Sequence, residues 1–270
     1  MNMTVDLGPL SLQAVHIFFL SALLVATVVG NWAGRKRKAT IGAVLLDMTL
    51  AGLVAGRIGF VILWFDQYRA APWSAIDIRD GGFHLWTGAV GAVLVAVWRL
   101  RKRPELREPL AAGLLAGAFA WLLSGAPTLL RMGQEKTIPA VMLSTLGGRP
   151  VALTAISKGR PMVVNLWASW CPPCRREMPV LAAAQQRNGA IAFVFANQGE
   201  DAQATGRYLQ RDRIVLDNVL LDPAKALGLA VGSMALPTTL FYDRSGKLRD
   251  VHLGPLSAAS LEAKLSMLRN

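Results

Sequence analysis

The sequence predicts two parts of different fold class: an α-helical transmembrane region of four spans over residues 1–130, and an α/β domain with a mixed central sheet over residues 139–270. Residues 131–138 are the predicted linker. The 270-residue chain is 53% hydrophobic and only 17% charged, which is too apolar for a wholly water-soluble protein of this length. Long stretches without charge are confined to the first half, whereas short apolar runs separated by helical patterns fill the second.

The first predicted span covers Leu7–Gly34, which contains no Lys, Arg, Asp or Glu and is long enough to cross a hydrocarbon core of about 30 Å. We expect it to be retained, because a cleaved signal peptide carries its basic residues before the apolar run, and here they follow it at positions 35–38. Three further spans are predicted, at Ile41–Phe65, about Gly82–Trp98, which is short and glycine-rich, and Pro109 to about Leu130.

Basic residues are unevenly distributed among the predicted loops. Residues 35–38 carry four Lys or Arg and Arg99–Arg107 carries five, whereas residues 66–81 carry two basic residues and three Asp. The positive-inside rule therefore predicts a multi-pass membrane protein with the basic loops in the cytoplasm and both termini outside. These loops hold most of the basic residues of the first half, so membrane topology explains much of the net charge of +12. The lipid bilayer is therefore an expected partner, and no nucleic acid is needed to explain the charge.

Asp47 and Arg57 lie inside the second predicted span, where an ionised side chain costs roughly 2.5 to 3.5 kcal/mol. Each should therefore face protein or a water-filled cavity. They are about 15 Å apart along a helix axis, so they are not expected to pair with each other. We favour a structural network between helices, and a lipid or substrate pocket is the alternative.

Several short motifs accompany these residues. They are Leu7-Gly8-Pro9-Leu10, Asp47 with Gly56-Arg57-Ile58-Gly59-Phe60, and Pro72 followed by Gly81-Gly82, Thr87-Gly88 and Gly91. Together they resemble the first half of prolipoprotein diacylglyceryl transferase, over about residues 7–98. That family's His-Gly-Gly signature is replaced by Leu85-Trp86-Thr87-Gly88, with His84 two residues too early, and its later Gly-Arg-x-Gly-Asn segment is absent from the sequence. The resemblance therefore implies a degenerate relative that serves as an anchor or a docking surface.

Gly, Pro and mixed charge mark the end of the membrane half. The linker that follows has about ten residues and reaches at most ~35 Å when fully extended. The second part of the chain must therefore work close to the bilayer. Its predicted elements alternate between strand and helix and end in a hairpin, which favours a mixed sheet with helices on both faces. They are strands at Met162–Trp167 and Ile191–Ala196, a helix at Cys174–Gln186, strands at Pro237–Tyr242 and Leu248–Leu253, and a helix at Leu256–Leu268 with Leu261, Leu265 and Leu268 on its inner side.

The two cysteines of the chain stand in Trp170-Cys171-Pro172-Pro173-Cys174, between the first strand and its helix. A C-x-x-C at a helix N-terminus exposes the first sulfur to unpaired N–H groups and the macrodipole, which favour the thiolate. Cys171 is therefore the predicted nucleophile and Cys174 the residue that resolves the mixed disulfide. Pro172 and Pro173 suit the first turn of a helix, and Trp170 flanks the motif.

Two other interpretations of this motif are weaker. A zinc site would need two more ligands, and His16, His84 and His252 lie at unsuitable positions. An inert structural disulfide would not explain the two prolines and the flanking Trp. We therefore expect no metal and no cofactor.

The stretch from Val163 to Pro179, which contains the dithiol, resembles the TlpA/ResA branch of the thioredoxin superfamily, and the similarity extends over nearly all of residues 139–270. The resemblance implies a thioredoxin-like fold and a thiol-disulfide oxidoreductase. Ala235-Leu236-Pro237-Thr238-Thr239 is similar to the cis-proline loop of that family. This implies that Pro237 lies against the dithiol in the cis form, beside a backbone edge to which a substrate peptide can pair.

Further residues are interpreted through the same resemblance. Asn165 stands where thioredoxin has a buried Asp and cannot move a proton, so Glu177, on the same helix face as Cys174, is the expected substitute. A surface carboxylate paired with an arginine is the alternative for Glu177. Glu200 and Asp201 are expected to begin the next helix, and Arg175 and Arg176 to face solvent or a partner.

Three functions remain open. In the first, which the TlpA/ResA resemblance implies, the chain is a multi-pass reductase of the bacterial cytoplasmic membrane, with both termini and the redox domain on the periplasmic side. It would act on exported thiol or disulfide proteins such as those of cytochrome c biogenesis. Because the membrane half has no Cys, this function implies a separate transmembrane electron donor of the DsbD or CcdA kind. In the second, the same site is a disulfide oxidase or isomerase, since direction depends on a reduction potential that the sequence does not give. In the third, the membrane half binds a lipid or scaffolds a partner, and the redox domain is accessory.

Overall fold

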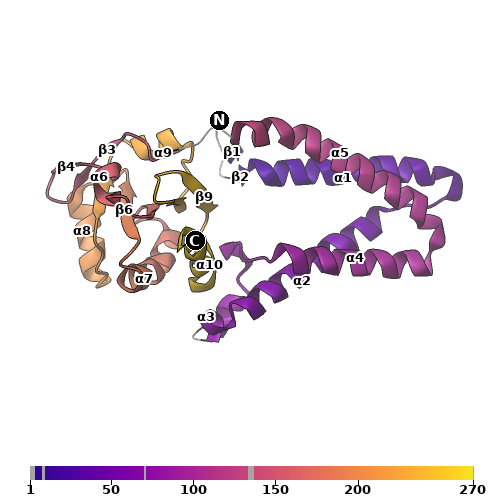
Figure 1. Cartoon of the computed structure of the whole chain (residues 1–270), viewed down its shortest axis with the longest axis horizontal. Coiled ribbons are helices and arrows are strands. Elements are labelled where there is room, and N and C mark those ends of the chain that lie inside the picture. The colour runs from indigo at the N-terminus through magenta and orange to yellow at the C-terminus, as the bar shows by residue number, and fades with distance from the viewer. Residues whose placement is uncertain (1–3, 8–9, 70, 133–136, 270) are drawn as a thin grey trace. The chain divides into compact units, whose positions relative to one another are not determined.

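The computed structural model describes residues 4–7, 10–69, 71–132 and 137–269, in two compact units (Figure 1). One unit contains the long helices, within Thr4–Phe65 and from Gly82 onward. The other contains the C-terminal α/β domain together with the segment Asp66–Gly81, which connects two of the long helices in sequence.

Four long helices form where spans are predicted: α1 (Ala14–Gly34), α2 (Gly42–Leu63), α4 (Leu85–Lys102) and α5 (Arg107–Met132). Short 3-10 helices η1 (Arg35–Arg37) and η4 (Pro104–Leu106) lie in the basic loops. The first helix begins later than predicted, because β1 (Thr4–Leu7) and β2 (Leu10–Gln13) pair as an antiparallel hairpin before it. Gly8 and Pro9 lie outside the described residues.

Within the described residues, three helices are long and apolar enough to cross a membrane: Ile17–Arg37, Gly42–Leu63 and Pro104–Gly125. The chain is therefore membrane-anchored. Helix α4, the fourth predicted span, forms at the expected place but does not meet this measure, because its last turn carries Arg99, Arg101 and Lys102. The last turn of α4 thus contains three of the basic residues that the sequence assigned to the following loop.

The long helices pack in two pairs, α1 with α5 and α2 with α4 (Figure 1). Small residues permit the close approach: a Cβ added to Gly88 of α4 would lie 2.9 Å from the carbonyl oxygen of Gly52 in α2. In the other pair, a Cβ on Gly113 would lie 2.7 Å from the carbonyl oxygen of Ala26. Small residues at helix contacts are typical of membrane helix bundles. The many exposed apolar side chains of these helices, among them Leu24, Val28, Ile62 and Leu115, suit contact with lipid.

The C-terminal domain is built on a mixed sheet of seven described strands in the order β4-β3-β7-β6-β5-β8-β9. At its centre, β5 (Met162–Trp167) pairs parallel with β6 (Ala192–Gln198) and antiparallel with β8 (Thr238–Tyr242). The mixed sheet and the predicted strands are confirmed, and β9 (Leu248–Leu253) has the predicted bounds. Three short strands were not predicted: β3 (Met142–Thr145), β4 (Pro150–Ala152) and β7 (Val219–Asp222).

Helices cover both faces of this sheet, as predicted. The larger apolar cluster packs α7 (Pro172–Arg187), α8 (Ala202–Arg211) and α10 (Ala258–Arg269) against Val163 and Trp167 of β5. The second cluster packs α6 (Leu153–Ser157) and α9 (Ala226–Val231) against Val164 and Leu166, which point to the other face. Leu261, Leu265 and Leu268 of α10 are buried, as the predicted inner side of that helix requires.

Candidate active site

The C-x-x-C motif lies where β5 ends and α7 begins, at the predicted position. Cys171 and Cys174 are joined by a disulfide, and Cys171 is the N-cap of α7. Its Sγ accepts a hydrogen bond from the backbone N–H of Cys174 at 3.3 Å, so the first sulfur lies at the positive end of the helix. Pro172 and Pro173 occupy the first turn, where their missing N–H groups are not needed. Both cysteines are buried, whereas the neighbouring Trp170 is 62% exposed.

The loop before β8 carries the proline that the family resemblance implies. The Leu236–Pro237 peptide bond is cis. Leu236 packs against the apolar cluster that contains both cysteines, and the carbonyl of Pro237 accepts a hydrogen bond from the N–H of Gly254 at 3.0 Å. Met234, three residues earlier, is 47% exposed. Trp170 and Met234 are thus exposed side chains beside the two loops whose residues pack into the cluster that contains the cysteines.

Glu177 is one turn after Cys174 on α7, and its side chain is buried, with only 1% of its surface exposed. Its two oxygens accept separate hydrogen bonds, from the Asn165 side-chain amide at 2.8 Å and from the backbone N–H of Leu256 at 2.9 Å. Asn165 also donates to the hydroxyl of Thr239 at 3.0 Å. The carboxyl group is thus an interior group held by β5 and by the start of the α10 region, and the alternative of a surface carboxylate paired with arginine is wrong.

Burial raises the pKa of Glu177 to about 7, although the two hydrogen-bond donors act in the opposite direction. A carboxyl group with this pKa changes its protonation state near neutral pH. It can therefore take or give a proton beneath the helix turn that carries Cys174.

The sequence led us to expect that Glu200 and Asp201 begin the next helix, but only Asp201 does so. Asp201 is the N-cap of α8 and accepts a hydrogen bond from the N–H of Ala204 at 2.7 Å. Glu200 instead accepts hydrogen bonds from both the backbone N–H (2.7 Å) and the hydroxyl of Ser169, and from the side-chain amide of Asn197 at 2.6 Å. It holds the loop that leads into Trp170 and Cys171. Because its partner Ser169 is distant in sequence, local pattern gave no signal for this role.

The two arginines after the motif face different surroundings. Arg175 lies 3.7 Å from the carboxylate of Asp212 and stacks over the Tyr208 ring at 5.7 Å, so its partners are on α8. Arg176 lines a cavity together with Glu177, Val180 and residues of the segment Asp66–Gly81.

Asp47 and Arg57 belong to the helical unit, whereas the dithiol belongs to the other unit. Asp47 of α2 forms an ion pair with Arg99 of α4. Arg57 is buried, donates to the carbonyl of Gly82 at 2.8 Å and lies 6.0 Å from the Phe83 ring. Both charges therefore have partners on or beside the neighbouring helix, the arrangement expected of a structural network.

No metal site was predicted, and among the described residues no group of three or more His, Cys, Asp and Glu side chains is placed to hold a metal ion. His84 is the N-cap of α4, and its ring accepts a hydrogen bond from the N–H of Thr87 at 3.4 Å. His252 is buried in the C-terminal domain, and burial lowers its pKa to about 4.

Comparison with known proteins agrees with both parts of this description. Residues 133–265 match the family Redoxin, and residues 2–134 match the family Prolipoprotein diacylglyceryl transferase. The thiol:disulfide interchange protein DsbE of Pseudomonas fluorescens is 33% identical over 57% of this chain and 86% of its own length. The thioredoxin-like protein YneN of Bacillus subtilis is 28% identical, covering 57% and 92%, and the thiol-disulfide oxidoreductase ResA of Geobacillus thermodenitrificans is 29% identical, covering 49% and 76%. The chain therefore belongs to the thioredoxin-like thiol-disulfide oxidoreductases of the DsbE and ResA kind, with a membrane region similar to prolipoprotein diacylglyceryl transferase joined to its redoxin domain.

Proposed function

We propose that this oxidoreductase is a membrane-anchored disulfide reductase of the periplasmic side, with residues 1–130 as anchor, 131–138 as linker and 139–270 as redox domain. The observation that carries the proposal is the Cys171–Cys174 pair at the N-terminus of α7, above a buried glutamate whose pKa is about 7. The resemblance to membrane-anchored TlpA/ResA proteins supports reduction as the direction.

In the proposed reaction the reduced domain gives two electrons to a substrate disulfide. The Cys171 thiolate attacks one substrate sulfur, the substrate S–S bond breaks, and the other substrate sulfur leaves as a thiolate that takes a proton from water. Cys174 then loses its proton, for which Glu177 is the proposed acceptor, and attacks the Cys171 sulfur. This step breaks the mixed disulfide, releases the second substrate thiolate and leaves the Cys171–Cys174 disulfide seen in the structure.

The substrates proposed are exported proteins with a disulfide or thiol pair, such as apocytochrome c. The cis-Pro237 loop would offer its backbone to an extended substrate segment, and the exposed Trp170 and Met234 would contact apolar side chains beside its cysteine. Because both cysteines of the chain are in the redox domain, electrons must come from another protein. A transmembrane thiol carrier of the DsbD or CcdA kind is the proposed donor.

Redox trapping in cells tests the direction. Acid quenching followed by thiol alkylation should find Cys171 and Cys174 mostly as the dithiol, and mostly as the disulfide in cells that lack the electron donor. A predominant disulfide in cells that contain the donor would instead support the oxidase or isomerase. A Cys174→Ser variant should accumulate mixed disulfides with its substrates, because the resolving thiol is missing, and these complexes would identify the substrates.

The membrane half is proposed to be an anchor. The internal partners of Asp47 and Arg57 favour this over a lipid-binding function, because neither charge needs a ligand to explain its presence. Replacing Arg57 with Leu should leave disulfide reduction unchanged. Loss of reduction in a variant that still inserts normally would favour a primary role of the membrane half.

A further inference from the structure

The segment Asp66–Gly81 connects α2 to α4 in the sequence, but in the structure it belongs to the same compact unit as the C-terminal domain. It is itself folded, through α3 (Phe65–Arg69) and the 3-10 helices η2 (Pro72–Ala75) and η3 (Ile78–Asp80). The hydroxyl of Tyr68 donates to the Asp80 carboxylate at 3.1 Å, which joins the two ends of the segment. Ala70 lies outside the described residues. The remainder is thus a small structured surface.

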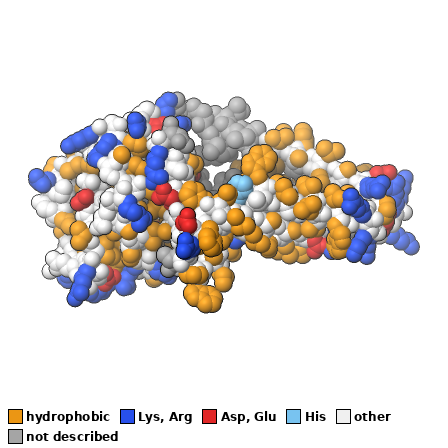
Figure 2. Space-filling view, turned by 60° about the horizontal axis from the view of Figure 1, so that its bottom comes forward, with side chains coloured by type: hydrophobic (Ala, Val, Ile, Leu, Met, Phe, Trp, Pro, Cys, Tyr) orange, Lys and Arg blue, Asp and Glu red, His pale blue; other side chains and the backbone are white. Residues whose placement is uncertain are grey.

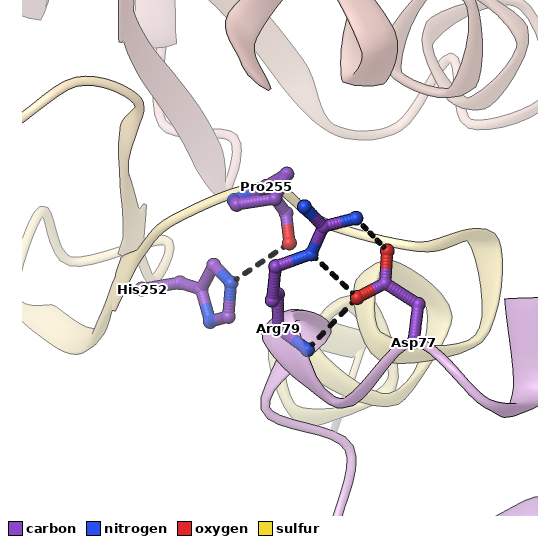
Figure 3. A network of polar contacts seen from close by, with 4 residues as sticks. All are labelled: Asp77, Arg79, His252 and Pro255. Atoms are coloured by element: carbon purple, nitrogen blue, oxygen red, sulfur yellow. Dashed lines mark hydrogen bonds and ion pairs between the residues drawn. The ribbon is translucent and has the colours of Figure 1, made fainter.

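This surface meets the domain at the turn between β9 and α10. Gly81 has a φ of +65°, which favours glycine, and a Cβ at this position would lie 3.3 Å from the His252 ring. The backbone carbonyl of Arg79 lies 3.6 Å from the corresponding Cβ position of Gly254. Figure 3 shows Asp77 and Arg79 beside His252 and Pro255, whose own hydrogen bond closes the turn. The segment and the turn between β9 and α10 are therefore in direct contact.

Charge complementarity adds to this contact. Asp77 accepts hydrogen bonds from the Arg79 side chain at 2.7 and 2.8 Å (Figure 3). These bonds, together with a smaller effect of the Arg176 charge on α7, lower the pKa of Asp77 to about 2. Asp77 is therefore ionised at neutral pH. The acidic segment and the basic start of α7 attract each other.

A cavity of about 280 Å³ remains between the two surfaces. Tyr68, Asp77 and Asp80 line it from the segment, and Arg176, Val180 and Leu256 are among the residues that line it from the domain. Glu177 also borders it. Neither Trp170 nor the cis-proline loop is among its lining residues, so the contact leaves the proposed substrate surface free.

We propose that Asp66–Gly81 is a docking segment for the redox domain, which binds the face made by Arg176, Val180 and the turn Pro255–Ala259. The connection between two membrane helices thereby becomes a second attachment of the redox domain, besides the linker. This docking does not depend on the direction of electron flow, because the same contact would serve a reductase or an oxidase.

Hydrogen exchange of the full-length protein in lipid nanodiscs tests this docking. In one variant, residues 71–79 are replaced by a Gly-Ser stretch of equal length. Amides of Leu256–Ala259 should then exchange at least about tenfold faster, because the surface that covers them is gone. Wild-type exchange at Leu256–Ala259 in this variant would overturn the proposal.

A charge reversal provides the matched comparison. Arg176→Glu should speed exchange within Asp66–Gly81 about two- to fivefold, as expected for the loss of one partly exposed attraction. Arg175→Glu, one residue earlier but directed at Asp212 and Tyr208, should not. Equal effects of the two reversals, or none from Arg176→Glu, would contradict docking. Dithiol trapping of the same variants reports the proposed function separately, so the two proposals can fail independently.

Discussion

Glu177 links the stability of the redox domain to pH. Its pKa is about 7 in the folded domain against an ordinary value of 4.5, so the folded state binds a proton in this interval that the unfolded state does not. The stability gained from this proton is fully present below about pH 4.5 and is lost as the pH rises through about 7. We predict that Glu177→Gln abolishes this loss, which is on the order of 3 kcal/mol for a buried group.

Calorimetric unfolding of the wild type and of Glu177→Gln, at several pH values between 4 and 8, measures this difference. His252 acts in the opposite direction: burial lowers its pKa to about 4, so the stability it contributes is lost as the pH falls from about 6.5 towards 4. Since both proteins retain His252, its effect cancels in the comparison. Parallel stability curves for the two proteins would contradict the assignment.

Glu200 should control the reactivity of Cys171 through the loop that it holds. In Glu200→Gln, the N–H groups of Ser169 and Asn197 share a neutral amide oxygen in place of a carboxylate, and the Ser169 hydroxyl must turn to accept from the new NH₂ group. The hydrogen bonds that hold the loop therefore become weaker. Looser placement of Cys171 at the helix N-terminus should slow alkylation of the reduced protein at neutral pH about two- to fivefold. Ser169→Ala, which removes the hydroxyl and keeps the backbone donor, should have a smaller effect. An unchanged alkylation rate in Glu200→Gln would show that the loop does not depend on this carboxylate.

These residues also show what local sequence can indicate. The i, i+3 spacing placed Glu177 on the face of Cys174, and the helix geometry excluded a pair between Asp47 and Arg57. The actual partners could not be predicted, because Arg99 is 52 residues from Asp47 and Ser169 is 31 residues from Glu200. Such pairs exist only after helices and strands have packed.

Between elements, the α2–α4 contact depends on glycine. We predict that Gly88→Ala destabilises the helical unit, because the added Cβ would meet the backbone oxygen of Gly52 at 2.9 Å and that oxygen cannot rotate away. Gly42→Ala is the matched control, since its Cβ would only touch a Thr27 methyl at 3.8 Å. Alanine favours a helix interior by about 1 kcal/mol over glycine, so intrinsic propensity alone predicts stabilisation at Gly88 and a smaller effect of the same sign at Gly42, the first residue of α2. Thermal denaturation in detergent separates the two cases, and equal behaviour would rule out close packing at Gly88.

The elements that sequence predicted well are those with long, uniform patterns. Strand β5 is buried along its whole length and appears in sequence as an apolar run interrupted only by Asn165. Strands β3 and β4 have only four and three residues and are partly exposed, so their pattern is indistinct. The β1–β2 hairpin was hidden because, from Leu7 onward, its residues are as free of charge as the helix that follows, and length alone did not separate them.

At the scale of the whole molecule, the distribution of charge predicts which side of the membrane each part faces. Lys and Arg gather at the end of the helical unit where α1 meets α2 and α4 meets α5, next to a band of apolar side chains (Figure 2). The positive-inside rule assigns this end to the cytoplasm. The opposite ends of α2 and α4 lead into Asp66–Gly81, which should therefore face the periplasm together with the redox domain.

This orientation predicts a labelling pattern for a membrane-impermeant maleimide. The chain has only two cysteines, so a Cys171→Ser, Cys174→Ser background accepts single reporters without interference. Trp73→Cys, at a side chain that is 84% exposed in the docking segment, should be labelled in intact spheroplasts. Lys36→Cys, in the first basic loop, should be labelled only after the membrane is permeabilised. In the otherwise wild-type chain, Cys171 should react in intact spheroplasts once it has been reduced. The reverse pattern would place the dithiol in the cytoplasm, where exported proteins could not be its substrates.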